Sequence, residues 1–245
     1  MASREDWMRR LGPLYGGAVA LVHSTPWRWP DAIGDEARSP GWIVALGAPV
    51  GLAAWACAAL AHAAGLPATV ASLIGLAALT VGSAALVERG LAERVEAMQS
   101  HTRSTAARAA GATVVLVFVT LGRAAAMFAL PPDRWLGVLV TTALVGRWAA
   151  VFLQALGDPI VDDAAPRSLV AAPAPSWLVA ALSLGVAIVA VLALGKAAIV
   201  ALALSAALVF ALGLDAQRRD RGLSAPVVAM AAAIGELVVL LVATI

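Results

Sequence analysis

Long apolar runs separated by short polar segments fill most of this chain. Seven such runs follow one another after residue 42. A helix needs about 20 mostly apolar residues to cross the hydrocarbon core of a bilayer. The pattern therefore predicts about seven transmembrane helices, near residues 43–65, 67–87, 109–130, 135–156, 175–195, 197–214 and 225–245.

The first part of the chain lacks a run of that length. A moderately apolar stretch over residues 11–22 is followed by two tryptophans and a proline. Short amphipathic stretches of this kind lie in the plane of the membrane surface and do not cross it. We therefore expect two parts: a cytoplasmic or interfacial segment over residues 1–42, and a helical bundle over 43–245 with a cytoplasmic loop at 88–108.

Composition indicates that lipid is the solvent for much of the chain. Apolar residues make up 62% of it and charged residues 13%, whereas soluble domains contain about 45–50% and about 25%. So few charges cannot cover a water-facing surface of this size. The expected fold class is all-α, a polytopic helix bundle with the lipid bilayer as its main partner. Cys57 is the single cysteine, which excludes a disulfide within the chain.

The basic residues are distributed unevenly among the connections. Positive residues are enriched on the cytoplasmic side of membrane proteins. Only Arg134 and Lys196 lie in the connections opposite the N-terminus, so we expect a cytoplasmic N-terminus in a multi-pass protein of the cytoplasmic (inner) membrane. The net charge is only +2 and the arginines follow topology, so no nucleic-acid partner is expected. The arginines on the N-terminal side are Arg4, Arg9, Arg10, Arg28, Arg38, Arg89, Arg94, Arg103, Arg108, Arg167, Arg218, Arg219 and Arg221.

Three ionisable residues fall inside predicted spans: Arg123, Arg147 and Glu236. A charge at the bilayer centre costs roughly 2.5–3.5 kcal/mol on insertion scales, so such residues face the bundle interior and find partners. At about 1.5 Å per residue, Arg147 and Glu236 both lie near the midplane. We therefore predict that they form a buried pair, either locking two helices together or serving a functional site.

The densest polar stretch is V-E-R-G-L-A-E-R-V-E-A, at residues 87–97. It contains Glu88, Glu93 and Glu96, and helical spacing places the last two on one face. Carboxylates suit Mg²⁺ because this hard cation prefers oxygen ligands, with a substrate phosphate completing its shell. The alternative interpretation is a solvated amphipathic helix in which glutamates and arginines pair, and the spacing alone favours that alternative.

Five short segments occur in order along the chain. They are A-L-V-H-S-T-P at 20–26, P-G-W-I-V-A-L-G-A-P-V-G-L at 40–52, the acidic stretch at 87–97, G-R-W at 146–148 and the closing segment at 222–237. This order resembles the cobalamin synthase family, the adenosylcobinamide-GDP ribazoletransferases. The corresponding family segments are F-L-T-R-L-P, an aromatic-proline-glycine opening of the first span, H-L-D-G-L-A-D-T-A-D-G, G-R-W, and G-V-T-G-D followed by E-L-S-E-L.

The acidic motif departs from the family pattern at two positions. Arg89 stands where the family has its first Asp, and Val87 stands where it has the leading His. Gly90 is kept, while Glu93 and Glu96 preserve the later carboxylates as longer side chains. An arginine at this place compensates the charge of neighbouring carboxylates and competes with a cation.

The closing segment departs in the same way. Pro226 occupies its Asp position and Ala233 one Glu position, while Glu236 is kept. The resemblance implies a Mg²⁺-dependent transfer that joins adenosylcobinamide-GDP to α-ribazole and releases GMP. The implied metal ligands are Glu93, Glu96 and Glu88, with no catalytic residue assigned.

The resemblance leaves two functions open. The first is a transferase with a reduced metal site, in which Arg147, Glu236 and Arg123 bind a cobinamide or nucleotide-type ligand. The second is a non-catalytic homologue that acts as a scaffold, assembly factor or subunit beside another membrane protein. Transport is disfavoured, because glycine and proline interruptions do not recur at matching places in two halves of the chain.

Overall fold

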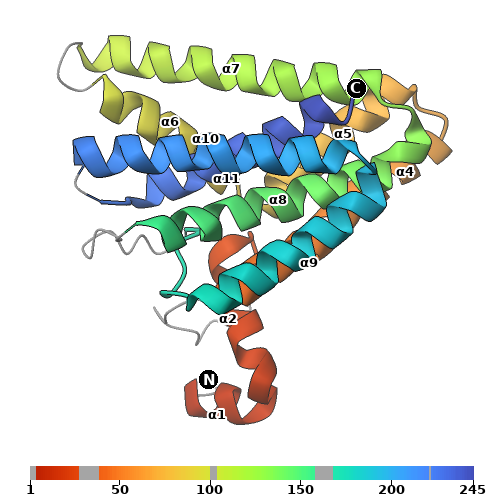
Figure 1. Cartoon of the computed structure of the whole chain (residues 1–245). Coiled ribbons are helices and arrows are strands. Elements are labelled where there is room, and N and C mark those ends of the chain that lie inside the picture. The colour runs from red at the N-terminus through yellow and green to blue at the C-terminus, as the bar shows by residue number, and fades with distance from the viewer. Residues whose placement is uncertain (1–3, 28–38, 100–103, 158–167, 221) are drawn as a thin grey trace.

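The computed structural model describes residues 4–27, 39–99, 104–157, 168–220 and 222–245. Over these residues it contains helices and no β-strand, which confirms the all-α prediction (Figure 1). Five of the arginines used to predict the orientation lie outside the described residues: Arg28, Arg38, Arg103, Arg167 and Arg221. The helices are α1 (Arg4–Leu11), η1 (Gly12–Leu14), α2 (Tyr15–Ser24), α3 (Pro40–Ala45), α4 (Gly47–Ala63), α5 (Ala68–Gly82), α6 (Leu86–Met98), α7 (Thr105–Ala129), η2 (Pro132–Arg134), α8 (Trp135–Leu156), α9 (Ser176–Leu194), α10 (Ala197–Asp220) and α11 (Ala225–Val242).

The helix lengths bear out a multi-pass membrane protein. Within the described residues, six helical segments are long and apolar enough to cross a bilayer: α3 with α4, α7, η2 with α8, α9, α10 and α11. The bent pair α5 and α6 brings the number to seven if it counts as one span. This confirms the prediction of about seven spans. The cytoplasmic placement of the N-terminus stays a prediction.

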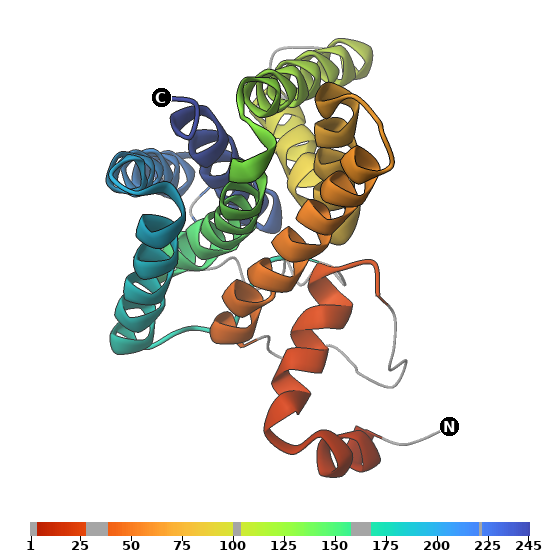
Figure 2. The same ribbon diagram turned by 90° about the vertical axis from the view of Figure 1, so that its right-hand side faces the viewer.

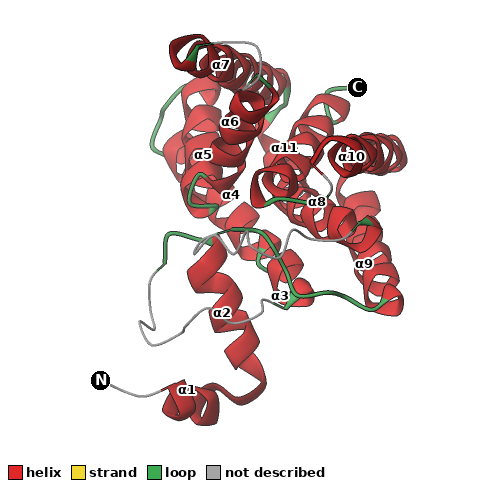
Figure 3. Ribbon diagram, turned by 90° about the vertical axis from the view of Figure 1, so that its left-hand side faces the viewer, coloured by secondary structure: helices red, strands yellow, loops and turns green. Residues whose placement is uncertain are grey.

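Helices α8 and α11 form the centre of the bundle (Figure 3). Within the most apolar stretch of each helix, the buried share is 78% in α8 and 72% in α11. It is only 28% in α7 and 22% in α9. The more exposed helices α7 and α9 lie on opposite sides of the bundle (Figures 1 and 3). Their exposed leucine, isoleucine, valine and phenylalanine side chains face outward, as expected for helices surrounded by lipid.

Glycines allow the central helices to approach closely. A Cβ on Gly51 of α4 would lie 2.6 Å from Cα of Val140 in α8. A Cβ on Gly235 of α11 would lie 3.0 Å from the carbonyl oxygen of Val145. Membrane helices associate through this kind of packing, because lipid supplies no hydrophobic force between them.

The predicted second span is bent: α6 leaves α5 at an angle of 75°. The Ala85 N–H donates to the Thr80 carbonyl at 2.9 Å, and the Ala84 N–H donates to the Val81 carbonyl at 2.9 Å. These two bonds are those of a Schellman motif, which normally places glycine at the left-handed position. Here Ala84 holds that position with φ of 53°, two residues after Gly82, the last residue of α5.

The predicted loop at 88–108 is largely helical where the structure describes it. Helix α6 continues to Met98, and α7 begins at Thr105. Helix α6 packs against α7 and α11, so the acidic stretch belongs to the bundle (Figure 1). The stretch is helical, but the solvated helix considered as the alternative is observed only in part: Arg89 and Glu93 pair on the surface, whereas Glu88 and Arg94 turn inward. The side of the membrane on which it lies stays a prediction.

The N-terminal segment projects away from the bundle. Helices α1 and α2 extend to one side of it in both end-on views (Figures 2 and 3). Neither is long enough to span a membrane. The N-terminal segment contacts the bundle through α2, which packs against α3.

Candidate functional site

The acidic stretch lies on α6, and its three glutamates have different surroundings. Glu93 accepts a hydrogen bond from Nε of Arg89 at 2.6 Å, and both side chains are largely exposed. Glu96 is exposed one turn further on. Glu88 is directed into the bundle. The structure therefore does not bring the three predicted metal ligands together, because Glu88 lies on another side of the helix.

Glu88 belongs to a buried ion network that joins three helices. Arg123 of α7 donates from Nη1 to Oε1 of Glu88 and from Nη2 to Oε2 of Glu236 in α11, each at 2.7 Å. Thr80 of α5 also donates to Oε1 of Glu88, at 2.9 Å. The Arg123 and Glu236 side chains are only 7% and 6% exposed, so this guanidinium compensates two carboxylates in an apolar environment.

Among the described residues Arg147 and Glu236 form no direct bond, although their charges lie close enough to act on each other. Glu236 pairs with Arg123, and Arg147 donates from Nη1 to Oγ of Ser24 at 2.8 Å and from Nη2 to the Ser24 carbonyl at 3.2 Å. Counting residues along the helices could not predict the direction in which each helix presents these two groups. All three predicted substrate-binding residues, Arg123, Arg147 and Glu236, are buried, and a ligand role for them stays a prediction.

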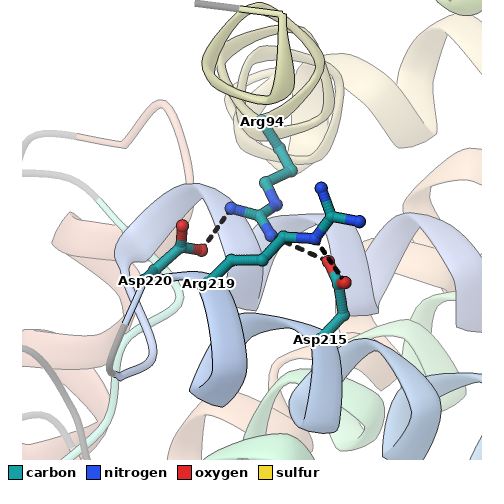
Figure 4. A network of polar contacts seen from close by, with 4 residues as sticks. All are labelled: Arg94, Asp215, Arg219 and Asp220. Carbon is teal, nitrogen blue, oxygen red and sulfur yellow. Dashed lines mark hydrogen bonds and ion pairs between the residues drawn. The ribbon is translucent and has the colours of Figure 1, made fainter. Parts of the chain in front are cut away.

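A second network fastens α6 to the end of α10 (Figure 4). The Arg94 side chain is only 4% exposed, and its guanidinium pairs with Asp220 and with Asp215, the latter at 3.3 Å. Asp215 is shared with Arg219 of its own helix, at 2.6 Å. Arg94 therefore does not neutralise the neighbouring glutamates of α6, and two aspartates of α10 are occupied by arginines.

Between these networks, α6 meets α11 at close range. A Cβ on Gly90 would lie only 2.1 Å from Cβ of Ala229, so the glycine is required for this contact. The space left beside it is a cavity of about 30 Å³. This is about the volume that one water molecule occupies in the liquid. Its lining consists of Leu86, Arg89, Gly90, Glu93, Ser168, Leu169, Ala225, Pro226 and Ala229.

The comparison with family models gives one match, to cobalamin-5-phosphate synthase, over residues 18–244. The chain belongs to this family. No curated protein and no solved structure matches it. The match begins within α2 and ends after α11, so it includes every helix of the bundle.

Two residues that line the small cavity lie in segments that resemble motifs of this family. In the resemblance described above, Arg89 and Pro226 stand at Asp positions of two cobalamin-5-phosphate synthase motifs that are far apart in the sequence. The structure places both residues on the wall of the same cavity. The two segments that resemble these motifs therefore meet between α6 and α11, where this chain has a guanidinium and a proline ring.

The residues at this place do not fit the magnesium ion that the family implies. Glu93 is engaged by Arg89, and no group of three His, Cys, Asp or Glu residues able to hold a metal occurs in the described part of the chain.

Several important partners were missed at the sequence level. Ser24 was not predicted as a partner of Arg147, yet it is buried at the end of α2 and accepts the bond from that guanidinium. Asp215 and Asp220 were not singled out, because a charged helix end normally faces solvent. A basic residue on the apolar face of α6, such as Arg94, is the signal that points to distant acidic partners.

Proposed function

We propose that this protein is a non-catalytic member of the cobalamin-5-phosphate synthase family that acts as a membrane scaffold. In this proposal it lacks the Mg²⁺-dependent transfer of a phosphoryl-linked group from adenosylcobinamide-GDP. The inference rests on family membership and on the residues found between α6 and α11, where the segments that resemble two acidic motifs meet.

A single observation carries the proposal: Arg89 and Pro226 line one cavity of about 30 Å³. Stabilising the charge that develops on a transferred phosphoryl group depends on cations held in place by the protein. Here Arg89 pairs with the retained Glu93 on the exposed side of α6, and Pro226 supplies neither a charge nor a side-chain hydrogen bond. These residues favour a closed, self-compensated contact between α6 and α11.

The buried charges support a structural role for what is retained. Arg123, Glu88 and Glu236 join α7, α6 and α11, and Arg147 joins α8 to α2 through Ser24. Each arginine satisfies groups within the bundle. Such networks hold the helices of a membrane bundle together, because an unpaired polar group in lipid costs several kcal/mol.

The transfer itself is tested by GMP release. The protein is reconstituted in nanodiscs with adenosylcobinamide-GDP, α-ribazole and Mg²⁺, beside an active family member treated identically as a positive control. We expect no GMP above the rate without protein. Mg²⁺-dependent release that is lost in a Glu93→Gln/Glu96→Gln variant would overturn the proposal and restore the transferase interpretation.

The scaffold role is tested by a separate measurement. The chain is reconstituted together with the active family member, and crosslinking and the thermal stability of the enzyme are followed. We expect a crosslinked complex in which the enzyme is more stable than alone. Independent behaviour of the two proteins would remove this role while leaving the loss of transfer untouched.

A further inference from the structure

The bend between α5 and α6 borders a cavity that neither the ion networks nor the proposed function accounts for. Its volume is about 350 Å³, within the range of small-molecule sites. The first part of its wall is the last three turns of α5, from Leu73 to Val81. Glu88 of α6 and the middle of α7, at Thr120 and Arg123, complete it.

The cavity opens on the outer side of the bundle. Leu73, Val81 and Thr120 at its wall are exposed, whereas Leu79 and Arg123 are buried. In a helix bundle surrounded by lipid, this arrangement gives a mouth facing the acyl chains and a floor inside the protein. A molecule entering here comes from the bilayer, and most of its body contacts leucine, alanine and valine side chains.

The floor of the cavity carries unused hydrogen-bonding capacity. Oε1 of Glu88 accepts bonds from Thr80 and Arg123, but Oε2 is buried, and no donor to it is found in the part of the chain that the structure describes. Within that part, Nε of Arg123 is also buried and unbonded. Buried polar atoms are nearly always paired, so an unpaired carboxylate oxygen at a cavity indicates a missing donor.

Charge points to the same kind of partner. Arg123 pairs with two carboxylates, Glu88 and Glu236, and the charge of Arg147 also acts on Glu236. At the cavity itself, the unbonded Oε2 of Glu88 complements a group that donates a hydrogen bond. A phosphate or carboxylate headgroup would be repelled by the free oxygen of Glu88.

The backbone between two wall residues of the cavity, Val81 and Glu88, is irregular. Irregular backbone at membrane depth is tolerated where it is buried in protein or lines a cavity, and broken helices often frame ligands there. The turn between α5 and α6 contains two consecutive alanines with left-handed backbone, Ala84 and Ala85, each with φ of 53°. Strain of this kind concentrates at functional sites.

We propose that this cavity binds an amphipathic, lipid-soluble molecule with a hydrogen-bond-donating head, a hydroxyl or an ammonium group. The head reaches the Glu88 carboxylate, and the apolar body lies against Leu73 and Leu76 of α5. This site is distinct from the contact between α6 and α11, and its occupancy does not depend on whether the chain catalyses transfer.

The test uses the full chain in nanodiscs and a photoreactive long-chain alcohol that carries a diazirine. Mass spectrometry maps the labelled residues, and dodecanol, dodecylamine and dodecane are compared as competitors. Loss of a hydrogen bond to a charged group is worth about 1.5–3 kcal/mol. We therefore expect the alcohol or the amine to compete about tenfold or more better than the alkane, and the stronger of the two identifies the head.

Two matched variants locate the site. Ala77→Trp fills the cavity and is expected to abolish labelling of Leu73, Leu76 and Thr120. Ala125→Trp adds the same bulk on an exposed face of α7 outside the cavity wall and is expected to leave labelling unchanged. Equal labelling in both variants would overturn the proposal. So would equal competition by dodecane in the unmodified chain, since ordinary acyl chains would then explain the cavity.

Discussion

At the scale of single residues, the buried arginines show what the sequence could and could not predict. Their burial followed from the cost of a charge in lipid, and the structure places Arg123 and Arg147 inside the bundle as expected. Their partners did not follow, because the direction of a side chain depends on how each helix is rotated about its axis. Arg123, which joins two carboxylates, was not expected to be the central residue.

Arg123 is the most sensitive position for stability in this account. Replacing it with Met leaves Glu88 and Glu236 buried without their cation, and breaking a buried pair costs about 3–5 kcal/mol. We expect Arg123→Met to lower the free energy of unfolding by about that amount, measured by denaturant titration in mixed micelles.

The matched control for Arg123 is Arg89→Gln. The Arg89 side chain is 70% exposed and the Glu93 side chain 43% exposed, so this ion pair contributes about 0–1 kcal/mol to stability. Equal losses of stability in the Arg123 and Arg89 variants would contradict the assignment of Arg123 as the centre of the buried network.

At the scale of helices, apolar run length was a reliable guide to spans and a poor guide to bends. The fourth run coincides with α8, Trp135–Leu156, because a buried central helix is uniformly apolar. The second run concealed the bend after Gly82, because its left-handed residue is an alanine. The hydrophobic pattern therefore predicted a straight helix where local hydrogen bonding produces a corner.

The Schellman motif at the end of α5 leads to the prediction that a glycine substitution raises the stability of the protein. A left-handed conformation costs a non-glycine residue about 1–2 kcal/mol. Ala84→Gly is therefore expected to stabilise the protein by about 1 kcal/mol, although glycine is usually destabilising in helical proteins. Thermal unfolding in detergent measures the effect.

Ala110→Gly is the control for the Ala84 variant. Ala110 is exposed within α7, where glycine costs about 0.8–1.0 kcal/mol relative to alanine. The two substitutions should shift the melting temperature in opposite directions. A shift of the same sign in both would show that the bend between α5 and α6 is absent from the folded protein.

The contact between α4 and α8 depends on Gly51. A Cβ there meets the backbone of Val140 at 2.6 Å, so Gly51→Val forces the helices apart and should cost about 1–3 kcal/mol. Gly185 of α9 has nothing within 4 Å of its Cβ position, so Gly185→Val should leave stability nearly unchanged. Similar losses from both substitutions, measured by unfolding in mixed micelles, would contradict the observed packing of α4 on α8.

At the scale of the whole molecule, the distribution of arginines predicts orientation. Ser104, at the start of α7, lies on the side with the excess of positive charge, and Leu66, between α4 and α5, lies on the other. In a Cys57→Ala background, a membrane-impermeant maleimide should label Leu66→Cys in intact spheroplasts. Ser104→Cys should be labelled only after permeabilisation. The reverse pattern would show that the bundle is inserted upside down.

At this scale the account depends on the contact between α6 and α11. There, Arg89 and Pro226 of this chain stand where the resembling family motifs have acidic residues. Resemblance gave the family, and the match over residues 18–244 confirms it. The closeness of Arg89 to Pro226 could not be predicted from the sequence, because it depends on the contact of Gly90 with Ala229.

The most direct test of this account is a titration of the reconstituted protein with Mn²⁺, which substitutes for Mg²⁺ and is followed by electron paramagnetic resonance. We predict that the Glu93→Gln/Glu96→Gln variant binds Mn²⁺ as the unmodified chain does, because neither carboxylate holds a cation. A saturable site present in the unmodified chain and lost in the double variant would contradict the account.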